Sequence, residues 1–296
     1  MAAKIISGKE ISCQIRDELK IRAEALAKRG VTPGLGVVLV GDDPASASYV
    51  SAKAKAALEL GLFEETVRLP AETSEKDILD TVDRLNRDDR FNGILVQLPL
   101  PKHVSPDKVI NFISPEKDVD GFHPVNVGRL LRGEPCPLPC TPYGVLAMLE
   151  RTGYDPAGKH VVICGRSNIV GKPLMALLVQ KKKGANATVT VCHTGTPDMS
   201  RFTLQADILV AAMGSPRAVT ADMIREGCVV IDVGVNRVED PSAPRGYRLV
   251  GDCDFESMKE KAAAITPVPG GVGPMTVTML MMNTIEAAER KAGLTP

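Results

Sequence analysis

The amino-acid sequence predicts an α/β protein of two domains, the second of which is a doubly wound parallel sheet. Helix and strand patterns alternate along most of the 296 residues, and a proline-rich stretch at 135–142 interrupts them. The strands expected after this stretch are apolar throughout. Such strands are typical of a parallel sheet that helices cover on both faces.

The first half is expected to alternate between helices and strands. Apolar residues at helical spacing predict the helices, and short apolar or β-branched runs predict the strands. The helices cover 8–28, 46–60 and 74–86, and the strands cover 35–40, 63–69 and 93–98. This order is that of consecutive strand–helix units.

The second half begins near residue 141, where Thr141 and Pro142 are typical of a helix cap and the first helical residue. Strands are expected at 161–164, 188–192, 208–212 and 229–233, each too apolar for an exposed sheet edge, with a helix at 172–182. A proline- and glycine-rich linker, 267–276, precedes a methionine-rich helix that ends near residue 292 and that we expect to return to the first domain. The expected domains are 1–140 with 275–296, and 141–274.

Composition excludes several classes of function. Lys plus Arg and Asp plus Glu are equal at 36 each, so no overall field favours nucleic acid or an anionic membrane as partner. The seven cysteines lack the paired spacing of zinc or redox sites, so no metal site is expected. No apolar stretch of about eighteen residues occurs that would span a membrane. We therefore expect a cytoplasmic protein in a reducing compartment.

The most informative segment runs from His160 to Pro173, where an apolar strand leads into a glycine-containing turn and then a helix. Gly165 permits a tight turn, Gly171 lets the helix pack closely on the strand, and free N–H groups at the helix start attract a pyrophosphate. The pattern departs from the usual dinucleotide fingerprint, because Ser167 replaces the middle glycine and the last glycine comes one residue late. A purely structural strand-to-helix turn is the alternative.

The residues around the next strand favour NADP over NAD. That strand ends at Cys192, and His193 and Thr194 follow where NAD-binding folds carry an acidic residue for the ribose hydroxyls. The guanidinium of Arg166 can instead hold a 2′-phosphate through two hydrogen bonds, and Thr194 adds a hydroxyl donor.

Ser46, Tyr49 and Lys53 are three and four residues apart, which places them on one stripe of the helix at 46–60, beside its apolar face. A half-buried tyrosine and lysine at this spacing can be a catalytic pair, or an interfacial pair whose amine reaches solvent. Short-chain dehydrogenases also use Tyr-x-x-x-Lys, but there the pair follows the glycine-rich turn. Here it precedes that turn by more than a hundred residues.

Gln97 and Asp120 are further candidates. Gln97 interrupts an apolar strand just before its carboxyl end, where ligands of open α/β sheets bind. Its amide could orient the Lys53 amine, which dry surroundings would keep neutral; satisfying the strand end is the structural alternative. Asp120 lies in an Asp-Val-Asp-Gly stretch that predicts a turn. Its carboxylate could accept two hydrogen bonds from an amino-heterocycle such as a pterin.

With these residues assembled, the chain resembles the bifunctional methylenetetrahydrofolate dehydrogenase/cyclohydrolase family over nearly its whole length. Eight segments carry the resemblance: Tyr49–Lys53, Gly93–Pro101, Asp118–Asn126, Pro139–Pro142, Gly165–Pro173, Asp232–Asn236, Gly251–Asp254 and Pro267–Thr276. Each is a weak motif alone, but their common order and spacing are specific.

The resemblance implies a cleft between the two domains, with a tetrahydrofolate one-carbon substrate on the first and NADP on the second, a Rossmann-type domain. The implied reactions are oxidation of 5,10-methylenetetrahydrofolate to the 5,10-methenyl form and its hydrolysis to 10-formyltetrahydrofolate. Family members are typically homodimers, so a homodimer is also implied.

The resemblance also implies roles for single residues. The catalytic residues would be Lys53, Gln97, Tyr49 and Asp120, with Lys53 central and tuned by Gln97, Tyr49 stacked on the folate and Asp120 holding the pterin edge. Substrate binding would involve Ser46, Tyr49, Gln97, Asp120, Pro269 and Gly270. NADP binding would involve Gly165, Arg166, Ser167, Thr194 and Val235, the last on the nicotinamide side.

Two rival functions remain open from the sequence. One is another NADP-dependent dehydrogenase that acts on a small carbonyl substrate with Lys53 as proton donor, and it leaves Tyr49, Gln97 and Asp120 without a role. The other is a nucleotide-responsive binding protein without turnover, for which loss of Lys53 would be the signature.

Overall fold

The computed structural model describes residues 2–243 and 246–294, which form two compact units. Unit 1 comprises Met1–Ser12 and Thr141–Thr276, and unit 2 comprises Cys13–Cys140 and Val277–Pro296. The expected α/β class, with a parallel sheet in the second half of the chain, is confirmed. The first twelve residues group with the second half rather than the first, because β1 (Lys4–Ile5) pairs in parallel with β11 (Ala264–Ile265).

Unit 1 is built on a six-stranded sheet in the order β1-β11-β8-β7-β5-β6, and every pairing in it is parallel. Its longer strands are β5 (His160–Cys164), β6 (Thr188–Cys192), β7 (Ile208–Ala211) and β8 (Val229–Asp232). Its shorter helices are α7 (Gly171–Leu178), α8 (Ser200–Thr203), the 3₁₀ turn η1 (Ala221–Met223) and α9 (Phe255–Met258), and α6 (Cys140–Thr152) leads into the sheet. The strands β5, β7 and β8 are almost wholly buried.

The expectation that no strand here forms a sheet edge is wrong for β6. It is the edge strand next to β5 and is only partly buried. Threonine and valine alternate along it, a pattern that suits a strand with one less buried face.

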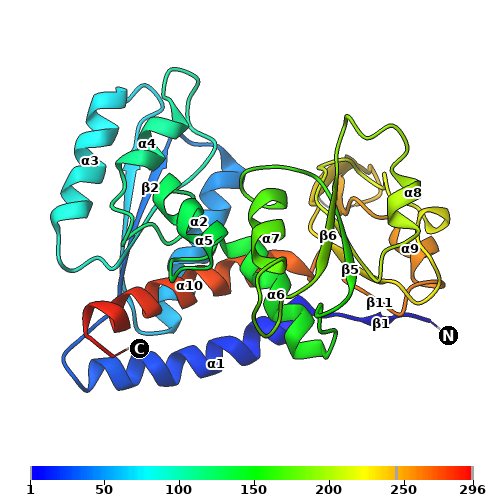
Figure 1. Ribbon diagram of the computed structural model, residues 1–296. Coiled ribbons are helices and arrows are strands. Elements are labelled where there is room, and N and C mark those ends of the chain that lie inside the picture. The colour runs from blue at the N-terminus through cyan, green and yellow to red at the C-terminus, as the bar shows by residue number, and fades with distance from the viewer. Residues whose placement is uncertain (1, 244–245, 295–296) are drawn as a thin grey trace. The chain divides into compact units, whose positions relative to one another are not determined.

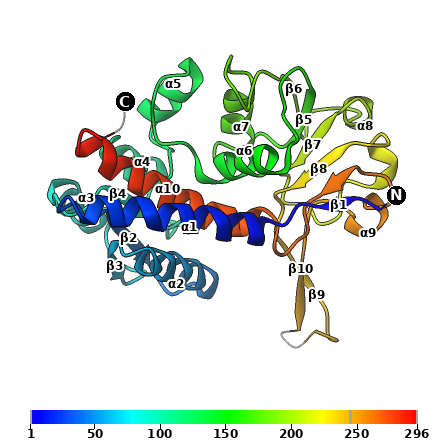
Figure 2. The same cartoon turned by 90° about the horizontal axis from the view of Figure 1, so that it is seen from below.

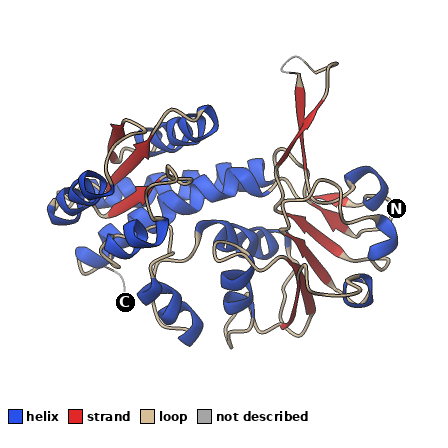
Figure 3. Ribbon diagram, turned by 90° about the horizontal axis from the view of Figure 1, so that it is seen from above, coloured by secondary structure: helices blue, strands red, loops and turns tan. Residues whose placement is uncertain are grey.

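An antiparallel ribbon of β9 (Asn236–Glu239) and β10 (Tyr247–Val250) projects from the sheet of unit 1 (Figure 2 and Figure 3). The sequence does not predict this ribbon, because its strands are only four residues long and mostly exposed. The Arg237 guanidinium lies 3.9 Å from the centre of the Tyr247 ring, a cation–π contact between the two strands.

Unit 2 contains a three-stranded parallel sheet in the order β3-β2-β4. Its strands are β2 (Gly34–Val40), β3 (Phe63–Leu69) and β4 (Gly93–Val96), and its helices, labelled in Figure 1, are α2 (Pro44–Glu59), α3 (Glu75–Arg87), α4 (Pro106–Phe112) and α5 (Pro124–Arg132). Ser74 caps α3 by accepting a 3.2 Å hydrogen bond from the main-chain N–H of Asp77. On α3, Ile78, Val82 and Leu85 repeat at helical spacing and are fully buried in the core of this unit.

Several expected boundaries were wrong. The strand expected at 93–98 ends at Val96, so Gln97 lies just after the strand rather than within it. The helix expected at 172–182 ends at Leu178, and the helix α10 (Val272–Lys291) begins inside the expected linker. Val272 and Met275 are buried, so burial of apolar side chains favours helix already at these positions. Like α1 (Gly8–Ala27), α10 has residues in both units.

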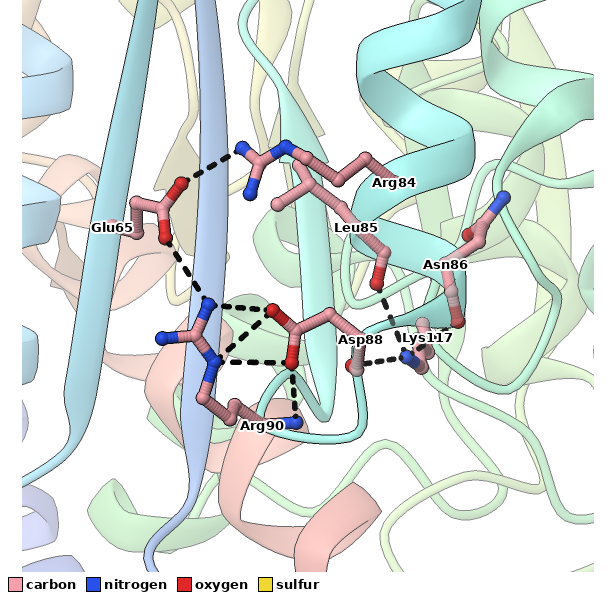
Figure 4. Close-up of polar contacts among 7 residues, drawn as sticks. All are labelled: Glu65, Arg84, Leu85, Asn86, Asp88, Arg90 and Lys117. Carbon is pink, nitrogen blue, oxygen red and sulfur yellow. Dashed lines mark hydrogen bonds and ion pairs between the residues drawn. The ribbon is translucent and has the colours of Figure 1, made fainter.

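A group of polar contacts lies near the amino-terminal ends of the strands in unit 2 (Figure 4). Lys117 Nζ donates to the carbonyl oxygens of Leu85 (3.2 Å), Asn86 (2.7 Å) and Asp88 (2.9 Å), and so satisfies carbonyls at the end of α3. Arg90 binds the Asp88 carboxylate through Nε and Nη2, the latter at 2.6 Å. These contacts lie at the opposite end of the strands from Gln97, which follows the carboxyl end of β4.

Candidate functional site

Lys53 and Gln97 are hydrogen-bonded in unit 2. Lys53 Nζ donates to Gln97 Oε1 at 2.9 Å, and Gln97 Nε2 donates to the Leu98 carbonyl oxygen at 2.6 Å. Both ends of the amide are therefore engaged, which fixes its oxygen toward the lysine. Lys53 and Gln97 are partly buried.

The start of α2 positions the rest of the stripe that the sequence predicted. Asp43 caps the helix, and its carboxylate accepts a 2.7 Å hydrogen bond from the main-chain N–H of Ser46. Ser46 is buried at this cap, whereas the Tyr49 side chain is 53% exposed. Tyr49 is thus open to stack on a ligand, and Ser46 contributes to the helix start.

Asp120 faces the charge of Lys53. Burial raises the pKa of the Asp120 carboxyl, and the nearby Lys53 charge opposes this rise. Cys140 Sγ donates to Asp120 Oδ1 at 3.5 Å. Burial, reinforced by Asp120, raises the pKa of the Cys140 thiol well above its usual value, so this thiol is a neutral donor. The structure thus places Lys53 within hydrogen-bonding distance of Gln97 and near enough to Asp120 for its charge to act on that carboxyl.

The turn before the site is made by Asp118 rather than by Asp120. The buried Asp118 carboxylate accepts from the main-chain N–H groups of Gly121 (3.1 Å) and His123 (2.8 Å) and from Asn126 Nδ2 (2.9 Å). Gly121 has φ of +71°, and a Cβ there would lie 2.7 Å from the main-chain nitrogen of Pro139. With Asp118 forming the turn, the Asp120 carboxylate is left for other contacts.

Cys140 and Asn283 also contact this site, although the sequence did not predict them as site residues. Asn283 on α10 is 1% exposed, and its Nδ2 donates to the carbonyl oxygens of Val119 (2.8 Å) and Leu138 (2.7 Å). It thereby fixes the main chain next to Asp120 and close to Cys140. The only signal in the sequence was an amide within a methionine-rich helix.

The glycine-containing turn of unit 1 follows β5. Gly165 has φ of +132°, and a Cβ there would lie 2.0 Å from the Ala212 carbonyl oxygen. A Cβ on Gly171 would lie 2.1 Å from the Gly165 carbonyl oxygen. Both positions therefore require glycine, for the two reasons that the sequence suggested: a tight turn and close helix packing.

This turn has the properties of a phosphate site. Within residues 2–243, the main-chain N–H groups of 166–169 form no hydrogen bond with another described residue. Ser167 Oγ accepts from the N–H of Val170 at 3.1 Å, which orders the turn before α7. Arg166 is exposed and has no ion-pair partner within the described ranges. Free N–H groups, a helix start and a free guanidinium suit a nucleotide phosphate.

The other predicted cofactor residues also follow strands of this sheet. Thr194 is exposed just after β6, where His193 Nδ1 accepts a 3.0 Å hydrogen bond from the Gly195 N–H. Val235 follows β8 and is 48% exposed. Carboxyl ends of parallel strands are where such folds bind ligands. Pro269 and Gly270 belong to unit 1, and the Gly270 carbonyl accepts from the Lys9 N–H at 3.0 Å.

Across the described part of the chain, no helix combines the length and apolar character that crossing a membrane requires.

Comparison with known proteins adds an independent finding. Residues 6–120 match the model of the tetrahydrofolate dehydrogenase/cyclohydrolase catalytic domain, and residues 139–292 match that of the NAD(P)-binding domain of the same family. The bifunctional protein FolD of Dehalococcoides mccartyi is 57% identical over 99% of both chains.

Solved structures agree with these matches. The bifunctional methylenetetrahydrofolate dehydrogenase/cyclohydrolase FolD from Campylobacter jejuni is 45% identical, with a TM-score of 0.92 over 98% of this chain and 100% of that one. The corresponding enzyme of Trypanosoma brucei, complexed with NADP cofactor and an inhibitor, is 41% identical, with a TM-score of 0.93 over 99% of both chains.

Proposed function

Since this chain belongs to the tetrahydrofolate dehydrogenase/cyclohydrolase family, we propose that Lys53, Gln97 and Asp120 form the catalytic centre of its two reactions. The protein is an oxidoreductase and a hydrolase of one-carbon metabolism. It oxidises 5,10-methylenetetrahydrofolate to the 5,10-methenyl form with NADP and hydrolyses that product to 10-formyltetrahydrofolate. The assignment of Lys53 rests on one observation, its 2.9 Å hydrogen bond to Gln97.

In the hydrolytic step, a water molecule adds to the methenyl carbon, and Lys53, acting as the neutral amine, takes up the proton that the water loses. As the bond from this carbon to N5 of the folate breaks, the proton of the adduct's hydroxyl passes to N5, and the carbon remains on N10 as a formyl group. Gln97 holds Lys53 Nζ in place without adding a negative charge beside the cationic substrate. A carboxylate in its place would tie the amine into an ion pair.

The folate is bound by residues around this centre. Asp120 accepts hydrogen bonds from the amino edge of the pterin, and the exposed ring of Tyr49 stacks on the folate. Ser46 fixes the start of the helix that carries Tyr49 and Lys53. Pro269 and Gly270 are proposed to contact the substrate on the basis of the family resemblance alone.

NADP, when bound, supplies the hydride acceptor for the oxidation. The turn at Gly165 fits this group, because the N–H groups of 166–169 are free to bind phosphate. Arg166 and Thr194 would bind the 2′-phosphate, and Ser167 would order the turn. Val235, exposed after β8, would border the nicotinamide.

We also propose that the protein is a cytoplasmic homodimer. All seven cysteines are free thiols, which is the usual state in a reducing compartment. The dimer is proposed from the family, and light scattering on the full chain during size-exclusion chromatography tests it: a mass near 31.6 kDa would contradict it.

A coupled assay tests the function. The purified chain is given methylenetetrahydrofolate and NADP, and methenyl absorbance and NADPH formation are followed separately. We expect NADPH to form without accumulation of the methenyl product, and Lys53→Met to make that product accumulate. Substantial hydrolysis by Lys53→Met would contradict the role of Lys53, and absence of NADPH in the wild type would contradict the function itself.

A further inference from the structure

Two buried aspartates of unit 1, Asp232 and Asp252, join loops at the carboxyl end of its sheet. Asp252 is fully buried, and its Oδ2 accepts from the main-chain N–H groups of Met213 (2.5 Å) and Gly214 (3.0 Å). Its Oδ1 accepts from the N–H of Ser215 at 2.9 Å. One carboxylate therefore binds the whole turn that follows β7.

Asp232, at the end of β8, connects two more segments. Its Oδ1 accepts from the N–H groups of Gly234 and Asp252, both at 3.0 Å, and its Oδ2 from that of Cys253 at 2.9 Å. Asn236 Nδ2 donates to Asp252 Oδ1 at 2.9 Å. The segments 213–215, 232–236 and 251–253 are thus held by two carboxylates, which we call the aspartate clamp.

The clamp leaves no room for a side chain at two glycine positions. A Cβ on Gly251 would lie 1.8 Å from Asp232 Oδ2, and a Cβ on Gly234 would lie 2.3 Å from Asp252 Cγ. Glycine at both positions lets the carboxylates approach the main chain directly. The clamp thereby fixes the residues on either side of Val235, which is itself exposed.

The clamp is also electrostatically costly. Within the described ranges neither carboxylate has an ion-pair partner. The charged group that acts on Asp232 is Asp252, and Asp232 in turn raises the pKa of the buried Cys253 thiol. Burial raises the pKa of Asp232 to about 6, Asp252 adds to the rise, and the main-chain N–H donors oppose it. Two adjacent buried acids without a cation are a poor means of stabilising a fold, which points to a functional reason for them.

We propose that Asp232 and Asp252 are positioning residues for hydride transfer, because they fix the loops that carry Val235 and Gly214 and thereby place the nicotinamide. This inference rests on the proposed function. Protonation of Asp232 would turn one acceptor oxygen into a donor that faces main-chain N–H groups, so the loops would loosen in acid. The hydrolytic step needs no nicotinamide and would be unaffected.

The test uses Asp232→Asn, which keeps the shape of the side chain but replaces one acceptor by a donor. Two activities are measured from pH 5 to 8: NADP-dependent oxidation, and hydrolysis of methenyltetrahydrofolate without NADP. We expect oxidation at pH 7 to fall about ten-fold, with a raised KM for NADP, while hydrolysis changes less than about two-fold. In the wild type, oxidation should decline below about pH 6, and this decline should be weaker in the variant. The 2′-phosphate of NADP also titrates at about pH 6 with both proteins. The measured quantity is therefore the difference in acid decline between the wild type and the variant.

Asp254→Asn is the matched control. Its carboxylate accepts from the Ser257 hydroxyl at 2.7 Å and is outside the clamp, so both activities should remain. Should Asp232→Asn fail to fold, Asn236→Ala removes one donor to Asp252 at a less buried position and should raise the KM for NADP several-fold. Equal loss of both activities, an unchanged acid decline in Asp232→Asn, or an unchanged KM in Asn236→Ala would overturn the inference. A wild type that lacks both activities would instead contradict the proposed function.

Discussion

Lys53 Nζ donates a 2.9 Å hydrogen bond to Gln97 Oε1 and so links the helix α2 to the residue that follows β4. The acceptor is a neutral amide. Burial raises the pKa of Asp120 and the charge of Lys53 opposes this rise, but no hydrogen bond joins the two side chains among the residues that the structure describes. The lysine is therefore positioned by an uncharged group and remains able to exchange protons with a water molecule.

Replacement of Gln97 by leucine should separate positioning from chemistry. Gln97→Leu removes the acceptor for Lys53 but keeps a side chain of similar size, so Lys53 loses its fixed orientation. We expect the rate of methenyltetrahydrofolate hydrolysis to fall about 10²-fold, the lower range for a positioned proton-transfer group. Stopped-flow absorbance of the methenyl form measures this rate. Full hydrolytic activity in a folded Gln97→Leu protein would rule out a role for this hydrogen bond.

Loss of the Asp120 carboxylate should weaken folate binding specifically. Asp120→Ala removes the proposed acceptor for two pterin N–H groups, and hydrogen bonds to a charged group contribute about 1.5–3 kcal/mol each. We expect the KM for methylenetetrahydrofolate to rise at least about ten-fold while the KM for NADP stays the same. Initial rates with each substrate varied in turn give both constants. Parallel changes in both would show that Asp120 acts on the fold rather than on the folate.

The turn at Gly165 gives a prediction for the cofactor alone. A Cβ on Gly171 would lie 2.1 Å from the Gly165 carbonyl oxygen, so Gly171→Ala must displace the turn that is proposed to bind phosphate. We expect Gly171→Ala to lose NADP-dependent oxidation by about 10²-fold and to retain methenyl hydrolysis. Gly273→Ala is the control, since a Cβ at Gly273 has no atom within 4 Å. Retained NADP binding in Gly171→Ala, measured by calorimetry, would contradict the assignment.

The periodicity of apolar residues predicted the helices and strands that bury their own apolar side chains. The strand at Phe63–Leu69 lies where the sequence placed it, and β2 and β5 differ from expectation by one residue. The ribbon β9–β10 was missed because its strands are only four residues long, mostly exposed and paired with each other. The edge position of β6 was missed because an apolar run does not reveal which neighbours a strand has.

In the candidate site, too, local sequence patterns predicted some features, whereas others depend on contacts made only in the folded chain. The hydrogen bond between Lys53 and Gln97 joins two positions that the sequence singled out, one on a helix stripe with Tyr49 and the other just after a strand whose carboxyl end is a usual place for ligands. The contacts of Cys140 and Asn283 could not be predicted, since they join segments that are separate in the sequence. The roles of Asp232 and Asp252 likewise depend on loops that only the fold brings together.

The pair of Asp88 and Arg90 predicts how stability changes in acid (Figure 4). Hydrogen bonds from the Arg90 side chain and its main-chain N–H lower the pKa of Asp88 from 3.8 to about 2. Because the folded-state pKa lies below the unfolded value, the stabilisation is present above pH 3.8 and is lost as the pH falls toward 2. We therefore expect Asp88→Asn to unfold at a lower temperature than the wild type at neutral pH, and this gap in unfolding temperature should narrow from about pH 4 downward.

Calorimetric scans of both proteins across this range measure the gap. Asp17→Asn is the control, because Asp17 is an exposed carboxylate on α1 without a described ion pair. A gap that stays constant down to pH 3 would show that the contact between Asp88 and Arg90 does not stabilise the folded protein.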